Sequence, residues 1–297
     1  MKGRPLRAPF FILCGLFLLV ASSSGLFAQD HLLAYEQLIN RLARDGLDSN
    51  YVLRIFDDPR SEPLPALMTL SLLPREVPDA YLQFLTPESI QRAKRFLRVN
   101  ERLLAEMEER YPVEKEIVVA ILLIESRLGE NIGQYRVIPA LASLALLDAP
   151  ENLWCNFLTL WAVSPDIAFE GFRERAQKRA QWAYEELKCF LRIARQETTD
   201  PLEIRGSYAG ALGMAQFVPS SYVTFAYKQK NLEHWIRSKE EAVFSIANYL
   251  KSHGWKKGMS HERKKRILWL YNHSKPYVDT VLQIAKRIRN ERRASAQ

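Results

Sequence analysis

The sequence predicts a mainly α-helical fold, and three observations support this class. Apolar residues recur every three or four positions through most of the chain, whereas the two-residue alternation typical of strands is not evident. Of the 297 residues, 47% are hydrophobic, which is ample for a core in one large domain or two small ones. The 15 prolines and 12 glycines form no fixed repeat and no low-complexity segment, which excludes a disordered or collagen-like chain.

Residues 1–28 are expected to be a signal peptide rather than part of the fold. Basic residues at 2–7 precede an apolar run at 10–21 and small residues at 22–25, which is the order of an export signal. We expect cleavage after Ala28 or among the preceding serines, and an exported, periplasmic or cell-envelope protein. An uncleaved anchor is the rival interpretation, although the run is shorter than the ~20 residues that span a bilayer. No later segment predicts a membrane span.

Charge and cysteine content narrow the possible partners. The formal net charge is +8, and part of the excess lies in a C-terminal basic cluster at residues 286–293, which we interpret as a solvated helix end. No basic patch with interleaved aromatics predicts nucleic-acid binding.

The three cysteines predict neither a lipid anchor nor a zinc site. Cys14 lies in the apolar run after Leu13, so we expect no lipid anchor there. Cys155 and Cys189 could pair or remain free thiols, and no His or acid is spaced with them as a zinc site requires. We therefore expect no metal and no cofactor.

Helices are expected in the following order. The first covers residues 32–42 and ends at Gly46, and a proline-rich loop at 58–78 follows. Thr86 and Pro87 then supply an N-cap and a first-turn proline for a helix reaching about residue 111. The later predictions are a helix from Pro112 to about Gly129, a short one at 139–147, an irregular aromatic segment at 148–165, a long helix at 167–196, a tight loop at 206–221, and helices at 221–227, 240–252, 263–271 and 277–289.

Glu125 stands at the end of a nearly unbroken apolar run, residues 117–124. Burying an unpaired carboxylate is costly, so such a group is paired, hydrogen-bonded or protonated. A carboxyl whose pKa is raised by apolar surroundings suits a general acid at neutral pH. The alternative is an acid at a helix end that pairs with Arg127 or Arg136.

The loop at residues 206–222 is dense in glycine, alanine and serine around one amide, Gln216. Small residues let a backbone or a ligand approach closely, and an amide among apolar neighbours suits a polar ligand such as a sugar. A tight helix crossing is the equally weighted alternative.

Four segments together resemble the membrane-bound lytic transglycosylase B family (glycoside hydrolase family 103, transglycosylase-like domain 2). They are residues 125–129 (Glu-Ser-Arg-Leu-Gly), the loop at 206–222, residues 248–255 (Asn-Tyr to Gly-Trp) and residues 270–277 (Leu-Tyr-Asn to Tyr). The resemblance covers about residues 35–289 in the family's order. It implies a lysozyme-like transglycosylase fold with additional helices, with residues 29–297 as the catalytic region.

The resemblance also implies a function in which Glu125 is the single catalytic acid/base. The enzyme would cleave the MurNAc-β-1,4-GlcNAc bond of peptidoglycan glycan strands and leave a 1,6-anhydromuramyl product. A hydrolytic muramidase, or a non-catalytic peptidoglycan-binding or scaffold protein that works with cell-wall synthesis or division proteins, is the alternative. The residues implied to bind the saccharide are Ser207, Gln216, Tyr249, Tyr271 and Asn272. For Tyr249 and Tyr271 the rival is a core aromatic with a satisfied hydroxyl, and for Asn272 a helix cap.

The chain departs from the family pattern at three places. Residues 227–235 replace the family's acidic calcium loop with one acid and two lysines, so a calcium loop is not expected. Leu128 stands where many members have an aromatic. Residues 148–185 form an apparent insertion whose Trp154, Phe157 and Trp161 could cap a cleft or form a packing or partner surface. The family has an arginine-containing loop in this region, to which Arg173, Arg175 and Arg179 do not align.

Overall fold

The computed structural model describes residues 31–73 and 78–294, which form two compact units divided after Glu62. The expected signal peptide, its cleavage site and Cys14 lie outside the described residues. Each unit is described by itself. Within the described residues no helix has both the length and the apolar character needed to cross a membrane.

The first unit is a pair of helices closed by a short turn. The predicted helix ends at Gly46, whose φ of 86° suits glycine. Asp48 caps the next helix by accepting a 2.8 Å hydrogen bond from the backbone N–H of Tyr51. The rings of Tyr35 and Phe56 join the two helices with centroids 4.7 Å apart. The elements are α2 (His31–Arg44), α3 (Ser49–Asp57) and the 3-10 turn η2 (Pro59–Ser61).

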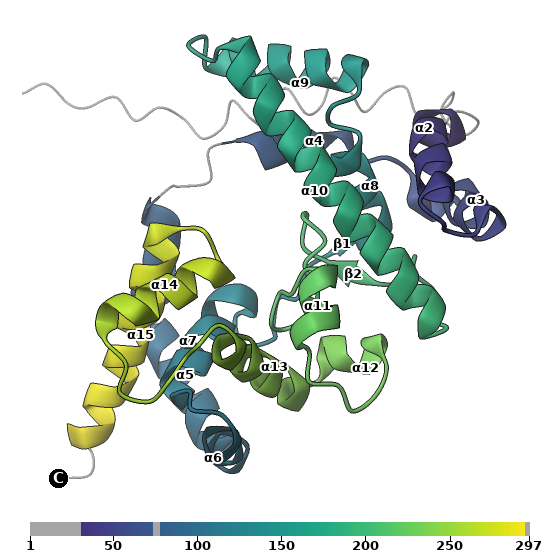
Figure 1. Cartoon of the computed structure of the whole chain (residues 1–297). Coiled ribbons are helices and arrows are strands. Elements are labelled where there is room, and N and C mark those ends of the chain that lie inside the picture. The colour runs from purple at the N-terminus through teal and green to yellow at the C-terminus, as the bar shows by residue number, and fades with distance from the viewer. Residues whose placement is uncertain (1–30, 74–77, 295–297) are drawn as a thin grey trace, which may run out of the picture. The chain divides into compact units, whose positions relative to one another are not determined.

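The second unit is helical apart from one two-stranded ladder among its described residues, which confirms the mainly α class (Figure 1). Its helices are α4 (Pro65–Leu72), η3 (Pro78–Leu85), α5 (Pro87–Val99), α6 (Glu101–Arg110), α7 (Lys115–Ser126), α8 (Val137–Ala145), α9 (Pro150–Val163), α10 (Phe169–Gln196), α11 (Pro219–Phe225), α12 (Leu232–Arg237), α13 (Lys239–Ser252), α14 (His261–Tyr271) and α15 (Lys275–Ala294). The strands are β1 (Tyr135–Arg136) and β2 (Arg205–Gly206), paired antiparallel.

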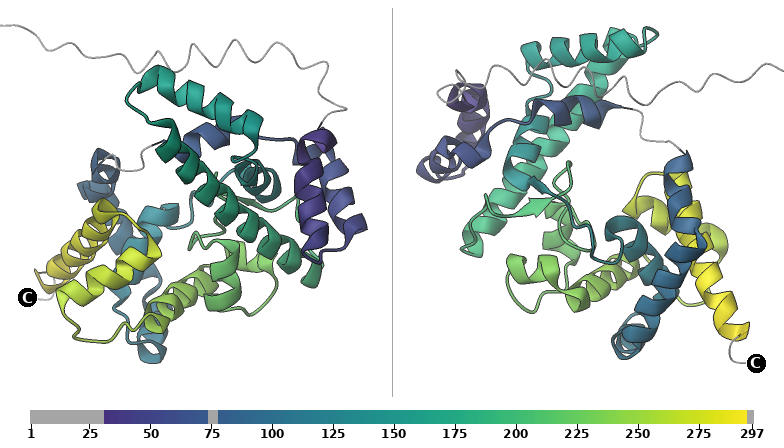
Figure 2. Two further views of the ribbon diagram at one scale, coloured as in Figure 1. Left: turned by 45° about the horizontal axis from the view of Figure 1, so that its top comes forward. Right: turned by 180° about the vertical axis from the view of Figure 1, so that it is seen from behind.

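Helix α7 is the buried centre of this unit. Its residues 117–123 are all buried, as expected for a helix that is apolar on every side. Helices α5, α6, α13 and α15 and the turn η3 pack around it, and both views of Figure 2 show α15 alongside α5 and α7. The helix ends where Arg127 and Leu128 adopt left-handed φ values of 51° and 66°. This end places Glu125 in the last turn.

Three predicted segments differ from the structure. The helix expected to reach residue 111 breaks at Asn100, whose side-chain amide donates to the Phe96 carbonyl at 2.7 Å and ends α5. The proline-rich loop contains α4, because Pro65 occupies a first-turn position where its missing N–H costs nothing. The aromatic segment at 148–165 is not irregular but contains α9, which Pro150 opens in the same way.

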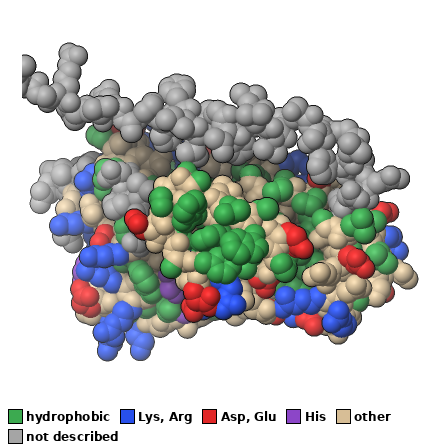
Figure 3. Space-filling view, turned by 90° about the horizontal axis from the view of Figure 1, so that it is seen from above, with side chains coloured by type: hydrophobic (Ala, Val, Ile, Leu, Met, Phe, Trp, Pro, Cys, Tyr) green, Lys and Arg blue, Asp and Glu red, His purple; other side chains and the backbone are tan. Residues whose placement is uncertain are grey.

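Helix α9 is apolar on two faces. Leu153, Asn156 and Leu160 are buried against the unit, while Trp154 and Trp161 are 52% and 48% exposed. Trp154 stacks on Phe169 of α10 with ring centroids 4.8 Å apart. Figure 3 shows hydrophobic side chains gathered on this side of the molecule. A helix without a polar face lacks the periodicity from which helices are predicted, which explains the error.

The long helix predicted at 167–196 is confirmed as α10, and it carries the second described cysteine. Cys155 on α9 is exposed and Cys189 on α10 is half-buried, and both are free thiols. Burial raises the pKa of the Cys189 thiol to about 11, so this group is an unreactive neutral thiol at physiological pH.

Candidate active site

One cleft of about 960 Å³ brings together the residues singled out in the sequence. It lies entirely within the second unit and is lined by the end of α7, the loop after β2, the end of α14, the C-terminal end of α4 and one face of α10. The lining includes Glu125, Ser207, Gln216, Tyr249, Tyr271 and Asn272, the complete set predicted from the sequence. These residues come from segments up to about 150 positions apart, and the fold makes them one surface.

Glu125 opens into this cleft and forms no ion pair with any described residue. Arg127 instead donates to the side-chain oxygen of Gln83 at 3.0 Å. Arg136 donates to the Leu202 carbonyl at 2.9 Å. The alternative that Glu125 is a paired acid at a helix end therefore does not hold, because both candidate partners point elsewhere.

Burial raises the pKa of Glu125 to about 7. The residue is partly open to the cleft, and the buried hydroxyls of Tyr271 and Tyr277 interact with its carboxyl. Its place in the last turn of α7 acts in the same direction, since the negative end of the helix dipole disfavours a carboxylate. A carboxyl with this pKa is present in both protonation states near neutral pH and can give and take a proton.

Tyr277 of α15 is a polar neighbour of Glu125 to which no role was assigned from the sequence. Its hydroxyl lowers the pKa of the carboxyl, which partly offsets the effect of burial. The pKa of the hydroxyl itself is held well above its usual value, first by burial and then by Glu125. Among the described residues this buried hydroxyl has no well-aligned hydrogen bond. It is therefore a neutral donor that faces Glu125.

The loop that carries Ser207 is shaped by close backbone approach. Gly206 pairs with Tyr135, and a Cβ at Gly206 would lie 2.3 Å from the Ala211 carbonyl oxygen, so only glycine fits. The Ser207 hydroxyl oxygen accepts hydrogen bonds from the backbone N–H groups of Ala209 at 3.2 Å and Ala211 at 3.0 Å. Its proton is left to donate into the cleft.

Gln216 is fixed in a left-handed conformation with a φ of 49°. Its side-chain nitrogen donates to the carbonyls of Gly213 at 2.8 Å and Ile132 at 3.2 Å. The backbone thus uses both amide protons, and the side-chain oxygen is the group that remains to accept from a ligand.

Tyr249 and Tyr271 are both core aromatics and cleft walls, so the two interpretations of each hold together. The Tyr249 hydroxyl donates to the Leu270 carbonyl at 2.7 Å, and the Tyr271 hydroxyl donates to the Ala215 carbonyl at 2.6 Å. Asn272 likewise forms the C-cap of α14, where its backbone N–H donates to Leu268 at 3.1 Å. Its side chain forms no hydrogen bond with the described residues and is available to a ligand.

The facing wall of the cleft comes from α10 and was missed in the sequence. Arg175, Lys178, Arg179 and Trp182 all line the cleft, at the i, i+3, i+4, i+7 spacing of one helix face. The spacing is visible in the sequence, but choosing the face that meets Glu125 requires the fold. Trp154, Phe157 and Trp161 are absent from the lining, so the aromatic cluster of α9 does not form a cap over it.

The described lining of the cleft is positively charged apart from a single carboxyl group, which is neutral when protonated. Three basic side chains of α10 line it, and Glu125 is the one acidic residue among the described residues of its lining. The guanidinium of Arg179 lies over the Trp182 ring, 4.2 Å from the ring centroid. This wall attracts an anionic ligand and offers an aromatic surface beside it.

Comparison with known proteins agrees with the fold. The family model described as the transglycosylase SLT domain matches residues 33–267, and the chain belongs to this family. Membrane-bound lytic murein transglycosylase B of Escherichia coli K12 is 34% identical over 220 residues, which is 71% of this chain and 50% of that protein. The chain thus spans about half the length of this curated relative.

Solved structures show that the lysozyme-like transglycosylase fold is shared. The catenated lytic transglycosylase SltB1 of Pseudomonas aeruginosa matches with a TM-score of 0.68 and 22% identity over 87% of this chain and 98% of that one. The Escherichia coli lytic transglycosylase Slt35, solved in complex with calcium, matches with a TM-score of 0.65 and 24% identity over 86% of this chain and 93% of that one. The predicted fold class and family are confirmed.

Proposed function

We propose that the chain is a peptidoglycan lytic transglycosylase that cleaves the MurNAc-β-1,4-GlcNAc bond and leaves a 1,6-anhydromuramyl end. The observation that carries the proposal is the Glu125 carboxyl, whose pKa is raised to about 7 in a cleft where no other described lining residue is acidic. Most glycosidases use two carboxyl groups, whereas intramolecular closure of the anhydro ring needs one.

In the proposed reaction Glu125 first acts as an acid. It protonates the glycosidic oxygen as the bond to C1 of MurNAc breaks, and GlcNAc departs with a free 4-hydroxyl. The carbonyl oxygen of the MurNAc N-acetyl group stabilises C1 by forming an oxazolinium ion. Holding the N-acetyl group next to C1 supplies several kcal/mol through its effective concentration.

Glu125, now ionised, then acts as a base. It removes the proton from the C6 hydroxyl, whose oxygen attacks C1 and displaces the acetamido oxygen. The 1,6-anhydro ring closes, and Glu125 is protonated again. No water is consumed, and the acid returns to its starting state without a cofactor.

The other cleft residues position the sugar. The Ser207 hydroxyl can donate to the N-acetyl group, and the Gln216 side-chain oxygen can accept from a sugar hydroxyl. The free side chain of Asn272 offers both a donor and an acceptor. Tyr249 and Tyr271 present ring surfaces held in place by their hydroxyl hydrogen bonds.

The cationic face of α10 favours strands that carry acidic stem peptides. Peptide carboxylates next to the glycan backbone would meet Arg175 and Lys178 on the wall facing Glu125. A substrate in the cell wall also agrees with the export signal expected at residues 1–28. We propose that the protein works in the periplasm or cell envelope.

Mass analysis of released muropeptides separates this function from its alternatives. A transglycosylase releases anhydro products that are one water lighter than those of a hydrolytic muramidase. A non-catalytic wall-binding or scaffold protein would co-sediment with sacculi and release no soluble product. Reducing-end products alone would replace the proposal with a muramidase.

A further inference from the structure

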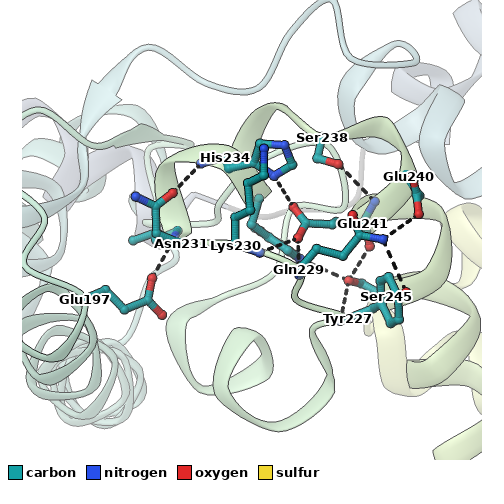
Figure 4. A network of polar contacts seen from close by, with 12 residues as sticks. Glu197, Tyr227, Gln229, Lys230, Asn231, His234, Ser238, Glu240, Glu241 and Ser245 are labelled. Atoms are coloured by element: carbon teal, nitrogen blue, oxygen red, sulfur yellow. Dashed lines mark hydrogen bonds and ion pairs between the residues drawn. The ribbon is translucent and has the colours of Figure 1, made fainter.

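The segment between α11 and α13, residues 226–238, is where the family resemblance implies a calcium loop. Slt35 has been solved in complex with calcium. In this chain the segment carries α12 and is surrounded by a network of side-chain contacts from α10 and α13 (Figure 4). Two carboxylates, Glu241 and Glu197, accept hydrogen bonds from backbone N–H groups of this segment.

Glu241 sits in the first turn of α13, and its side chain is fully buried. One carboxylate oxygen accepts hydrogen bonds from the backbone N–H groups of Gln229 at 2.5 Å and Lys230 at 3.3 Å. The other lies 2.8 Å from Nδ1 of His234, which is the donor because an ionised carboxylate can only accept. A single side chain thus joins the turn before α12 to the side chain of His234 within α12.

Glu197, the residue that ends α10, holds the start of α12. Its carboxylate accepts from the backbone N–H of Leu232 at 2.5 Å and from the Tyr222 hydroxyl at 3.0 Å. Asn231 completes this start by accepting from the His234 backbone N–H at 3.2 Å.

A calcium ion does not fit this segment. Both oxygens of Glu241 already accept from N–H donors, which a cation would have to displace. Residues 227–235 bring two lysines and one acid, whereas Ca²⁺ takes six to eight oxygen ligands. Across the described residues no group of three or more His, Cys, Asp and Glu side chains could hold a metal ion.

Helix α12 lies directly behind the loop that supplies Gln216. Gly213 has a φ of 61°, and a Cβ there would lie 3.0 Å from both Cα and the carbonyl oxygen of Ile236. The Trp235 ring packs on Phe217, with centroids 5.8 Å apart, and Phe217 lines the cleft beside Gln216. Any movement of α12 therefore reaches the cleft through Gly213 and Phe217.

We propose that Glu241, assisted by Glu197, is a positioning residue that holds α12 against the cleft loop and makes the site independent of calcium. The two carboxylates hold this segment in place, which is the role that the family resemblance implies for a bound metal ion. The positioning role rests on the proposed function, whereas independence from metal does not.

The test compares Glu241→Gln with Glu240→Gln, its half-buried neighbour on α13, whose carboxylate accepts from the Gln229 side chain at 2.6 Å and from no backbone N–H of the segment before α12 (Figure 4). Glutamine has nearly the same volume as Glu241 but carries no negative charge. Its NH₂ group would also face an N–H donor where the carboxylate oxygen accepted a hydrogen bond. We expect KM for glycan strands to rise about tenfold with a smaller change in kcat, since one charge-assisted hydrogen bond is lost. Glu240→Gln should behave as wild type.

Two further measurements keep the result interpretable. Should Glu241→Gln fail to fold, His234→Ala removes one donor from the network and should raise KM in the same direction by a smaller factor. The wild-type melting temperature, measured with EDTA and with millimolar calcium, should be the same.

The two parts of the inference can fail separately. A melting temperature that falls with EDTA or rises with calcium would overturn metal independence, whether or not the protein cleaves glycan. A folded Glu241→Gln with the wild-type KM would overturn the positioning role. Loss of all activity in wild type would count against the proposed function and leave the melting result standing.

Discussion

At the scale of single residues, the chemistry depends on where α7 stops. Glu125 lies one residue before the end of a helix that is buried on every side, and two left-handed residues then turn the chain away. The carboxyl is thereby placed at the negative end of the helix dipole and at the edge of a cleft, with Tyr277 as its polar neighbour. One group obtains the pKa of a general acid without a second charged residue.

The pH dependence of the reaction follows from this carboxyl. The pKa of Glu125 is raised to about 7, and the first step needs the protonated form. We expect kcat/KM for clearance of purified sacculi to fall about tenfold per pH unit above about 7, at constant ionic strength. An activity that keeps rising up to pH 9 would contradict the role of Glu125 as the acid.

The same shift predicts a gain in stability for Glu125→Gln. A raised pKa means that the folded protein binds more protons than the unfolded chain between pH 4.5 and about 7, so wild-type stability falls as pH rises through this window. At pH 8 the variant should be more stable by roughly 1–3 kcal/mol, less than the full shift because the carboxyl is partly open to the cleft. Urea unfolding at pH 8 and pH 4.5 measures the difference in free energy of unfolding between the variant and wild type. The same difference at both pH values would contradict the prediction.

At the scale of elements, α10 joins the cleft to the segment behind it. Its first half supplies the cationic wall, and its second half supplies Glu186, which accepts from the backbone N–H and the hydroxyl of Ser220 at 2.9 and 2.7 Å. Its C-cap residue, Glu197, holds the start of α12. The helix therefore fixes three parts of the site at once.

The double variant Arg175→Ala/Lys178→Ala tests the wall. Loss of two cationic side chains should raise KM about three- to tenfold for glycan strands that carry stem peptides, and leave KM for neutral chitooligosaccharides unchanged. Arg173→Ala is the matched control, because Arg173 lies on the same helix, pairs with Glu170 and does not line the cleft. An equal change in KM for both substrates would show that these side chains do not select substrates by their negative charge.

Elements whose ends and faces are set by residues close together in the sequence could be predicted from the sequence. The cap at Thr86, the turn at Gly46 and the long α10 follow from caps, glycine and periodicity, and the structure confirms them. Helix α9 was missed because it is apolar on both faces and so shows no helical stripe.

At the scale of the whole molecule, the described residues separate after Glu62, and the complete cleft belongs to the second unit. The predicted site residues meet there because the family motifs, taken together, resemble one known arrangement. The roles of Tyr277, Arg175 and Glu241 could not be predicted, since each depends on contacts between segments far apart in the chain. A local sequence pattern cannot predict which backbone N–H group, distant in the sequence, will donate a hydrogen bond to a buried carboxylate.

The central claim is that Glu125 alone, as acid and then base, produces an anhydro-muropeptide. The most direct measurement is mass spectrometry of the soluble products of purified sacculi digested with wild type and with Glu125→Gln. We expect wild type to release muropeptides one water lighter than hydrolytic products, and the folded variant to release none above background. Hydrolytic products alone, or equal digestion by Glu125→Gln, would contradict the account.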